Sequence, residues 1–112
     1  MRLPEDNVLL HDMLDHARRA AEAVAGRRRA DLDTDPLLAA ALERFIEVIG
    51  EAARKVSTGT QEAADEIPWR QIIGMRNRLV HGYAAVDHSI VWDVASVDIP
   101  ALIASLEQLL ES

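Results

Sequence analysis

Residues 36–56 read PLLAAALERFIEVIGEAARKV, and this stretch decides the fold class. Its apolar residues recur at spacings of three and four, which is the period of an α-helix with one buried face. That face comprises Leu38, Leu42, Phe45, Ile49, Ala52 and Val56. Asp33 or Asp35 can cap the helix, and Pro36 suits its first turn. The stretch therefore predicts a long amphipathic helix.

Two further segments show the same period. The first helix is expected to begin near Pro4 and to end at Gly26, with a buried face of Leu10, Met13, Leu14, Ala17, Ala21 and Val24. A third helix is expected to begin at Pro68 and to run to about Gly82. The polar stretch between the second and third helices is expected to be a loop, with at most one helical turn.

The C-terminal part is less clear, because residues 89–97 fit either a short helix or a β-strand. No second strand is evident, so we expect a helix here. Asp98 can cap the last helix, whose first turn contains Pro100. The whole chain is then one all-α domain over residues 1–112, an antiparallel bundle of four long helices and one short one.

The composition excludes several classes of protein. The chain has 112 residues, enough for one domain with a core. It has no cysteine, which excludes a disulfide scaffold, a thiol nucleophile and a cysteine-based zinc site. No apolar run approaches the ~18 residues that span a bilayer. The first residues do not resemble a secretory signal, so we expect a cytoplasmic protein without a membrane partner.

The charge is negative overall but uneven along the sequence. A net charge of −7 argues against a protein that coats nucleic acid. Residues 67–86, however, contain Arg70, Arg76 and Arg78 and no acidic residue. Such a window suits a small anionic site. The basic triplet at residues 27–29 is expected to be a solvated helix end, although it could also contact RNA.

Arg76 conflicts with its surroundings in the expected third helix. At ~100° per residue, it shares a face with Trp69, Ile72, Ile73, Leu79 and Val80. Burial of an unpaired guanidinium is costly. Arg76 must therefore pair with Glu47 or Glu51, or line a cleft that an anion enters. Glu51 could itself orient Arg76 or His81, or pair with Lys55.

Further polar residues gather beside Arg76 in the same expected helix. Asn77 and His81 are four residues apart and would stack on one flank, with Arg70 seven residues before Asn77. Gly74 lies on the same flank of the expected helix as these residues. A mid-helix glycine costs ~1 kcal/mol relative to alanine, and it favours a place that something approaches closely.

The remaining histidines do not form a metal site. His11 and His16 are five residues apart on the first helix, a spacing that is poor for joint metal binding. His88 follows Asp87 in an expected turn. We expect all three at the surface, and we expect no metal or other cofactor.

The segment Arg76–Tyr83, RNRLVHGY, resembles the signature of the HEPN superfamily. More narrowly, it is similar to the HepT-type toxins of HEPN/MNT (type VII) toxin–antitoxin pairs, which carry Arg, four residues, His, one residue and Tyr. Asn77 matches the polar residue that follows the arginine. The segments IGEAA (49–53), IPWR (67–70) and VW (91–92) are also similar to that family.

The resemblance implies a helical homodimer that cuts RNA without a metal, with Arg76, His81 and Asn77 as catalytic residues. The supporting or RNA-contacting positions are then Arg70, Gly74, Arg78 and Glu51. It also implies a nucleotidyltransferase antitoxin (MNT) as partner, which attaches adenylyl groups to Tyr83 and silences the nuclease. Without the family, Tyr83 could simply close the helix end.

The chemistry is consistent with this resemblance. Cleavage by the 2′-hydroxyl of RNA needs a base, an acid and a cation. A histidine can serve as acid or base near neutral pH, and one chain offers one such histidine in the motif. A symmetric dimer would supply two, and Trp69 and its apolar neighbours would then form the interface. The alternatives are a non-catalytic helical subunit that presents nucleotide or substrate to a nucleotidyltransferase, and a purely structural dimerisation domain.

Overall fold

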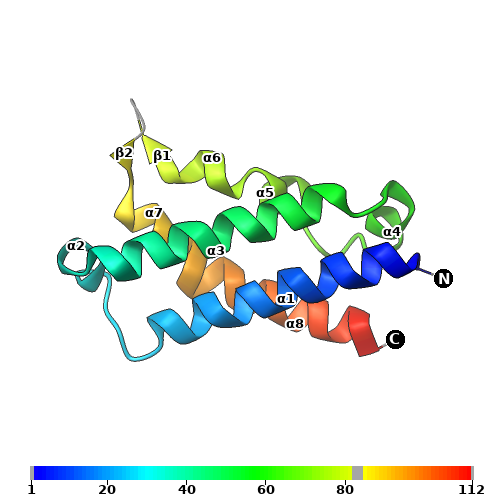
Figure 1. Cartoon of the computed structure of the whole chain (residues 1–112), viewed down its shortest axis with the longest axis horizontal. Coiled ribbons are helices and arrows are strands. Elements are labelled where there is room, and N and C mark those ends of the chain that lie inside the picture. Colours follow the sequence, from blue (N-terminus) through cyan, green and yellow to red (C-terminus); the bar gives the residue numbers. More distant parts are fainter. Residues whose placement is uncertain (1, 82–84, 112) are drawn as a thin grey trace.

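Two long antiparallel helices form the centre of the fold. In the computed structural model, which describes residues 2–81 and 85–111, α1 spans Pro4–Val24 and α3 spans Pro36–Lys55. The two helices share the largest interface in the described chain. Figure 1 shows α5 and α6 along one side of α3, while α8 lies against α1 on the other side. The predicted all-α fold is confirmed.

Shorter elements complete the chain around these helices. Their bounds are α2 Asp31–Thr34, α4 Thr58–Ala63, α5 Trp69–Ile73, α6 Met75–Leu79, β1 Val80–His81, β2 Ala85–Val86, α7 His88–Asp93, the π-helical turn η1 Val94–Asp98, and α8 Ile99–Glu111. The two strands form a short antiparallel ribbon, in which Val80 pairs with Val86 and His81 pairs with Ala85.

Local signals in the sequence set the ends of the long helices. The side chain of Asp35 accepts a hydrogen bond from the backbone N–H of Leu38 and caps α3, as one of the two predicted caps. After α1, Gly26 has a φ of 73°, a left-handed conformation that favours glycine. Both predicted boundaries are therefore confirmed.

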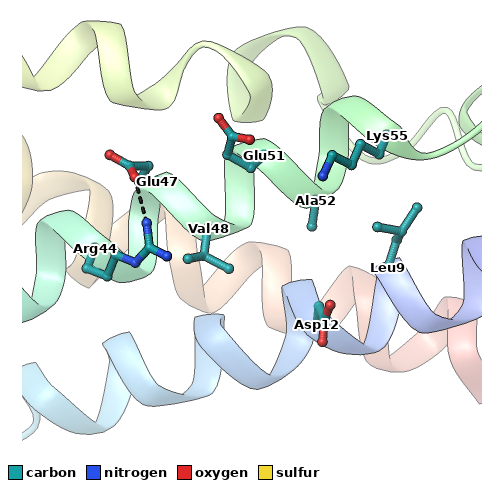
Figure 2. Close-up of a pocket in the computed structure, with 8 residues that line it drawn as sticks. All are labelled: Leu9, Asp12, Arg44, Glu47, Val48, Glu51, Ala52 and Lys55. Atoms are coloured by element: carbon teal, nitrogen blue, oxygen red, sulfur yellow. Dashed lines mark hydrogen bonds and ion pairs between the residues drawn. The ribbon is translucent and has the colours of Figure 1, made fainter.

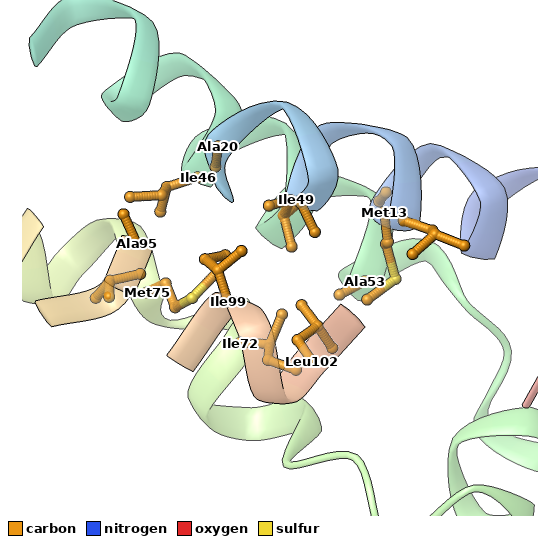
Figure 3. Close-up of a cluster of buried hydrophobic side chains, with 14 of the residues drawn as sticks. Met13, Ala20, Ile46, Ile49, Ala53, Ile72, Met75, Ala95, Ile99 and Leu102 are labelled. Carbon is orange, nitrogen blue, oxygen red and sulfur yellow. The ribbon is translucent and has the colours of Figure 1, made fainter. Parts of the chain in front are cut away.

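The core is formed by apolar side chains from four parts of the chain. Figure 3 shows Met13 and Ala20 from α1 facing Ile46, Ile49 and Ala53 from α3, with Ile72, Met75, Ala95, Ile99 and Leu102 closing the cluster. Full burial of one such Leu, Ile or Met side chain stabilises the fold by roughly 1.5–3 kcal/mol. The position of α5 and α6 is therefore fixed by the same core that joins α1, α3 and α8.

The C-terminal region is a single long helix over residues 88–111. The predicted helix at residues 89–97 is confirmed. The prediction that a separate helix begins at Asp98 is wrong. The backbone N–H of Ile99 bonds to the carbonyl of Val94, five residues earlier, which widens the helix into a π-type turn. Pro100 has no N–H to donate, and it follows directly after this turn, so the helix continues past it.

The same helix is rich in apolar residues. By length and composition alone, His88–Glu111 is long and apolar enough to cross a membrane. This differs from the sequence-based expectation that no run approaches that length. A set of its residues belongs to the core with α1 and α3, namely Val91, Val94, Ala95, Ile99, Leu102 and Leu106. Its packing as a core helix accounts for part of this apolar character.

A buried carboxylate ties the start of α1 to α4. Asp6 is only 2% exposed. It accepts hydrogen bonds from the backbone N–H of Ser57 at 3.0 Å and from the hydroxyl of Thr60 at 2.6 Å. The hydroxyl of Ser57 also donates to it. These bonds lower the pKa of Asp6, the largest contribution coming from the Ser57 hydroxyl.

Candidate active site

Arg76 points away from the core, although residues on either side of it are buried. Gly74 ends α5 with φ −88° and ψ 1°, and α6 follows directly. Ile72, Met75 and Leu79 are spaced three and four residues apart and are all buried. Arg76 lies beside this buried stripe, with 63% of its side chain exposed. The prediction that Arg76 lies near the middle of an apolar face is wrong, because the buried face runs through Ile72, Met75 and Leu79 instead.

Gly74 therefore marks a helix break. A Cβ built at Gly74 would meet the carbonyl oxygens of Arg70 at 3.3 Å and Gln71 at 3.9 Å, both from its own helix. Among the described residues, no other segment approaches it within that range. The role of Gly74 at an RNA-contacting position stays a prediction.

A close approach between two helices occurs at Gly50 on α3. A Cβ at this position would lie 3.2 Å from the carbonyl oxygen of Ile72 and 3.4 Å from that of Ile73. The missing side chain lets the backbone of α5 pack directly on α3. This contact sets the distance between the acidic residues of α3 and the polar residues of α6.

A shallow hollow, which we call the Arg76 hollow, lies where α3 meets α5 and α6. It has a volume of about 180 Å³ and is lined by Glu47, Gly50, Glu51, Arg54, Ile73, Arg76 and Asn77. Three of the predicted site residues meet here: Arg76, Asn77 and Glu51. Arg54 was not predicted from the sequence, although it stands seven residues after Glu47 on the same side of α3.

Glu47 joins two arginines at the edge of this hollow. Its Oε2 accepts a hydrogen bond from Nε of Arg76 at 3.0 Å, and its Oε1 accepts one from a terminal nitrogen of Arg44 at 2.7 Å. Figure 2 shows Glu47 and Glu51 projecting from α3 on the side away from α1. Glu47 was one of two predicted partners for Arg76, and it is the one that Arg76 binds.

Glu51 pairs with Arg54, which was not among its predicted partners, and the predicted contact with His81 lies outside the described residues. Its Oε2 lies 3.4 Å from a terminal nitrogen of Arg54, one turn along α3, and the structure shows no ion pair with Lys55. Both Glu47 and Glu51 also line a larger hollow of about 400 Å³ between α1 and α3 (Figure 2). Glu51 thus lies between two hollows, close to Arg76 but not bonded to it among the described residues.

The other predicted arginines do not line the Arg76 hollow. Arg78 pairs with Asp98 on η1, at 3.2 Å between Nη1 and Oδ2. Arg70 is exposed on α5. These cations lie on the same segment as Arg76, so they can add positive charge beside the hollow without being part of it.

Outside this segment, the basic triplet forms surface ion pairs and His11 is exposed, as predicted, whereas His16 and His88 are partly buried and His88 begins α7 instead of lying in a turn. Of the basic triplet, Arg27 pairs with Asp35 at 3.3 Å and Arg29 pairs with Asp33 at 2.7 Å, which fits a solvated helix end. His88 bonds Asp33 at 2.9 Å. His11 is exposed, and His16 is partly buried against Phe45.

The predicted helix does not reach His81. The chain leaves the helix after Leu79, and His81 enters the strand β1, so the predicted helical stacking of Asn77 and His81 is wrong. The side chain of His81 and all of Tyr83 lie outside the described residues. The ribbon brings the backbone of His81 opposite Ala85, and Asp87 donates its N–H to the carbonyl of Leu79 at 2.7 Å.

Trp69 belongs to the core of the subunit. It is 8% exposed, and its indole Nε1 donates to the carbonyl of Ala64 at 3.0 Å. The expectation that Trp69 and its apolar neighbours form a dimer interface is therefore wrong. Trp69 begins α5, so this anchoring helps to hold α5 against α3.

The electrostatics of the hollow are balanced. Two carboxylates, Glu47 and Glu51, face two guanidinium groups, Arg54 and Arg76. Outside the hollow, the hydrogen bond with His88 lowers the pKa of Asp33, and the backbone N–H of Leu38 lowers the pKa of Asp35. No three acidic or histidine side chains gather as metal ligands among the described residues.

This arrangement exposes the permanently charged guanidinium of Arg76 to solvent. Within the described residues, Arg76 uses Nε for Glu47, and its two terminal nitrogens have no other acceptor. A guanidinium with free terminal nitrogens can bind two oxygens of one phosphate at once. Asn77, beside it, adds an amide that can donate or accept.

Comparison with known proteins gives one consistent result. The family described as "Ribonuclease HepT-like" matches residues 13–109. The chain is 32% identical over 102 residues, 91% of each protein, to "Putative RNase TTE0752" of Caldanaerobacter subterraneus subsp. tengcongensis. It is 38% identical over 69 residues, 62% of this chain and 63% of the relative, to "Probable ribonuclease HepT" of Thermococcus cleftensis.

No solved structure gives a significant match to the chain. The family match begins within α1 and ends at residue 109, near the end of α8. It contains the whole Arg76–Tyr83 segment. The chain therefore belongs to the HepT-like ribonuclease family.

Proposed function

We propose that this protein is the toxin of a toxin–antitoxin pair and acts as a metal-independent endoribonuclease. The observation that carries the proposal is the exposed guanidinium of Arg76, which is held at the Arg76 hollow beside Asn77 in a chain of the HepT-like family. Names of relatives such as "Probable ribonuclease HepT" point to the same activity.

The reaction uses the 2′-hydroxyl of the RNA as its nucleophile. The 2′-oxygen attacks the adjacent phosphorus, and the bond from phosphorus to the 5′-oxygen breaks. A base removes the proton of the 2′-hydroxyl, and an acid gives a proton to the departing 5′-oxygen. The products are a 2′,3′-cyclic phosphate and a 5′-hydroxyl. Charge builds up on the non-bridging oxygens during this step, and Arg76 stabilises it.

His81 acts as the general acid or the general base. An imidazole changes protonation near neutral pH and suits either role. One subunit supplies one motif histidine, so we propose a composite site in which two copies of the chain face each other and the second His81 supplies the other group. Asn77 positions the phosphate, while Arg70 and Arg78 attract the RNA backbone and Glu51 supports the hollow.

The activity is controlled by a nucleotidyltransferase antitoxin of the MNT type. This partner transfers an adenylyl group from ATP to the hydroxyl of Tyr83 and releases pyrophosphate. Tyr83 follows His81 by two residues, so the added phosphate places negative charge close to the catalytic segment. RNA, which is itself an anion, is then repelled and obstructed.

The test is cleavage of labelled RNA by the purified protein in the presence of EDTA. We expect cyclic phosphate ends, and we expect a substrate with 2′-deoxyribose at the cleavage position to resist. Dependence on an added divalent cation would contradict the metal-independent reaction. Nucleotide binding without any cleavage would instead favour the alternative, a helical subunit that presents nucleotide or substrate to a nucleotidyltransferase.

A further inference from the structure

We propose that Glu47 is the positioning residue for Arg76: it holds the guanidinium through Nε and leaves both terminal nitrogens free for a phosphate. This inference rests on the proposed function, because it assigns the residue that prepares Arg76 for RNA. Glu47 itself does not touch the reacting atoms in this scheme.

Both carboxylate oxygens of Glu47 accept hydrogen bonds. Its two carboxylate oxygens serve different cations, Oε2 for Arg76 on α6 and Oε1 for Arg44 on α3. Contacts on both oxygens restrict the rotation of the carboxylate. Since Glu47 stands on a 20-residue helix that is built into the core, it offers a rigid support.

The contact with Glu47 uses only one of the N–H donors of the Arg76 guanidinium. Arginine has five N–H donors in one plane, one on Nε and four on the terminal nitrogens. The contact at Nε uses the donor nearest the stem of Arg76 and leaves the outer four available among the described residues. A carboxylate that took the terminal nitrogens would block phosphate, whereas a contact at Nε fixes the plane and keeps the outer edge open.

Arg76 is more exposed to solvent than Glu47, its support. Arg76 has 63% of its side chain exposed, against 34% for Glu47. An exposed arginine without a support samples several rotamers, and ordering it has an entropic cost. The contribution of such a surface pair to folding is small. The effect of Glu47 should therefore appear in activity and not in thermal stability.

The kinetic test uses Glu47→Gln, which keeps the shape of the side chain and removes its charge. We expect kcat for RNA cleavage to fall about 10- to 100-fold, because a misplaced group in the transition state costs that order of rate. The shape of the pH–rate profile should not change, since Glu47 carries no proton in the reaction. The matched control is Glu107→Gln, which breaks another exposed interhelical pair, Arg18–Glu107 at 2.6 Å, away from the hollow.

A second variant tests whether Glu47 acts through Arg76. In an Arg76→Lys background, which keeps a cation but has no guanidinium plane, Glu47→Gln should change kcat less than twofold. An equal fall in both backgrounds would show that Glu47 acts independently of Arg76 and would overturn the inference. A fall in Tm that explains the lost activity would overturn it as well.

An NMR measurement separates this inference from the proposed function. The Nε–H resonance of Arg76, assigned by its loss in Arg76→Lys, should be protected from exchange in the wild-type protein and exposed in Glu47→Gln, but unchanged in Glu107→Gln. If this pattern is found and no RNA is cut, the proposed function fails while the contact stands. If the wild type cuts RNA and Glu47→Gln changes neither kcat nor the resonance, the inference is wrong.

Discussion

A Cβ placed on Gly50 would lie 3.2 Å from the carbonyl oxygen of Ile72, so α3 and α5 meet backbone to backbone. This contact brings Glu47 on α3 within 3.0 Å of the Nε of Arg76 on α6. The candidate site therefore depends on a glycine that has no chemical role of its own. Its position in the sequence, directly before Glu51, links helix packing to the chemistry of the hollow.

Gly50→Ala tests this dependence. Overpacking against the carbonyls of Ile72 and Ile73 costs about 1–3 kcal/mol, and the better helix propensity of alanine returns about 1 kcal/mol. We expect a net loss of about 1 kcal/mol in the free energy of unfolding, measured with urea. RNA cleavage should fall further than this loss explains, because α5 and α6 move away from Glu47.

The matched control for this variant is Gly59→Ala. Gly59 lies in α4, and nothing lies within 4 Å of the place where its Cβ would be. We expect this change to be neutral or to stabilise the protein by up to about 1 kcal/mol. Equal stability and equal activity for the two variants would contradict the role given to Gly50.

The buried carboxylate of Asp6 predicts a pH-dependent contribution to stability. Its pKa in the folded protein lies below the ordinary value of 3.8. The contribution is then fully present above about pH 4 and is lost as the pH falls through the lowered pKa. At neutral pH, Asp6→Asn should reduce the free energy of unfolding by about 1–3 kcal/mol, since a charged acceptor is removed from buried donors.

Thermal unfolding at several pH values checks this prediction. The difference in Tm between wild type and Asp6→Asn should be largest at neutral pH and should shrink toward about pH 3. Asp15→Asn serves as the control, because Asp15 forms an exposed pair with Arg19 on α1. A difference that grows on acidification would mean that the sign of the linkage is wrong.

Adenylylation is predicted at one hydroxyl, that of Tyr83. Incubation with the MNT partner and ATP should add AMP to the peptide that contains Tyr83, as read by mass spectrometry, and cleavage of RNA should stop. Tyr83→Phe should remain an active nuclease that the partner cannot silence. Modification of other residues with Tyr83 left unmodified would contradict the assignment.

The helices that carry the core could be predicted from the sequence, since each has clear local signals. The apolar spacing in α3, its Asp35 cap and the glycine after α1 each act over a few residues, and the structure has all three. The same local logic singled out the segment that contains Arg76, Asn77 and His81, because the motif is contiguous in the chain. The roles of these residues stay a prediction.

What could not be predicted depends on packing between distant segments. The predicted apolar face of the third helix was centred on Arg76, whereas the buried face in the structure runs through Ile72, Met75 and Leu79. The choice between Glu47 and Glu51 as partner of Arg76 depended on the register of α5 on α3, which Gly50 sets. The helix through Asp98 and Pro100 was missed because a π-type turn removes the need for a break.

The most direct test of the account compares RNA cleavage by the wild type with that by His81→Ala and Arg76→Ala under the same conditions, with circular dichroism to confirm folding. We predict that the wild type forms cyclic phosphate ends and that each variant loses at least about 100-fold in rate, while thermal stability changes by no more than a surface pair contributes, about 1 kcal/mol. Full cleavage by folded His81→Ala, with the same product ends, would contradict it.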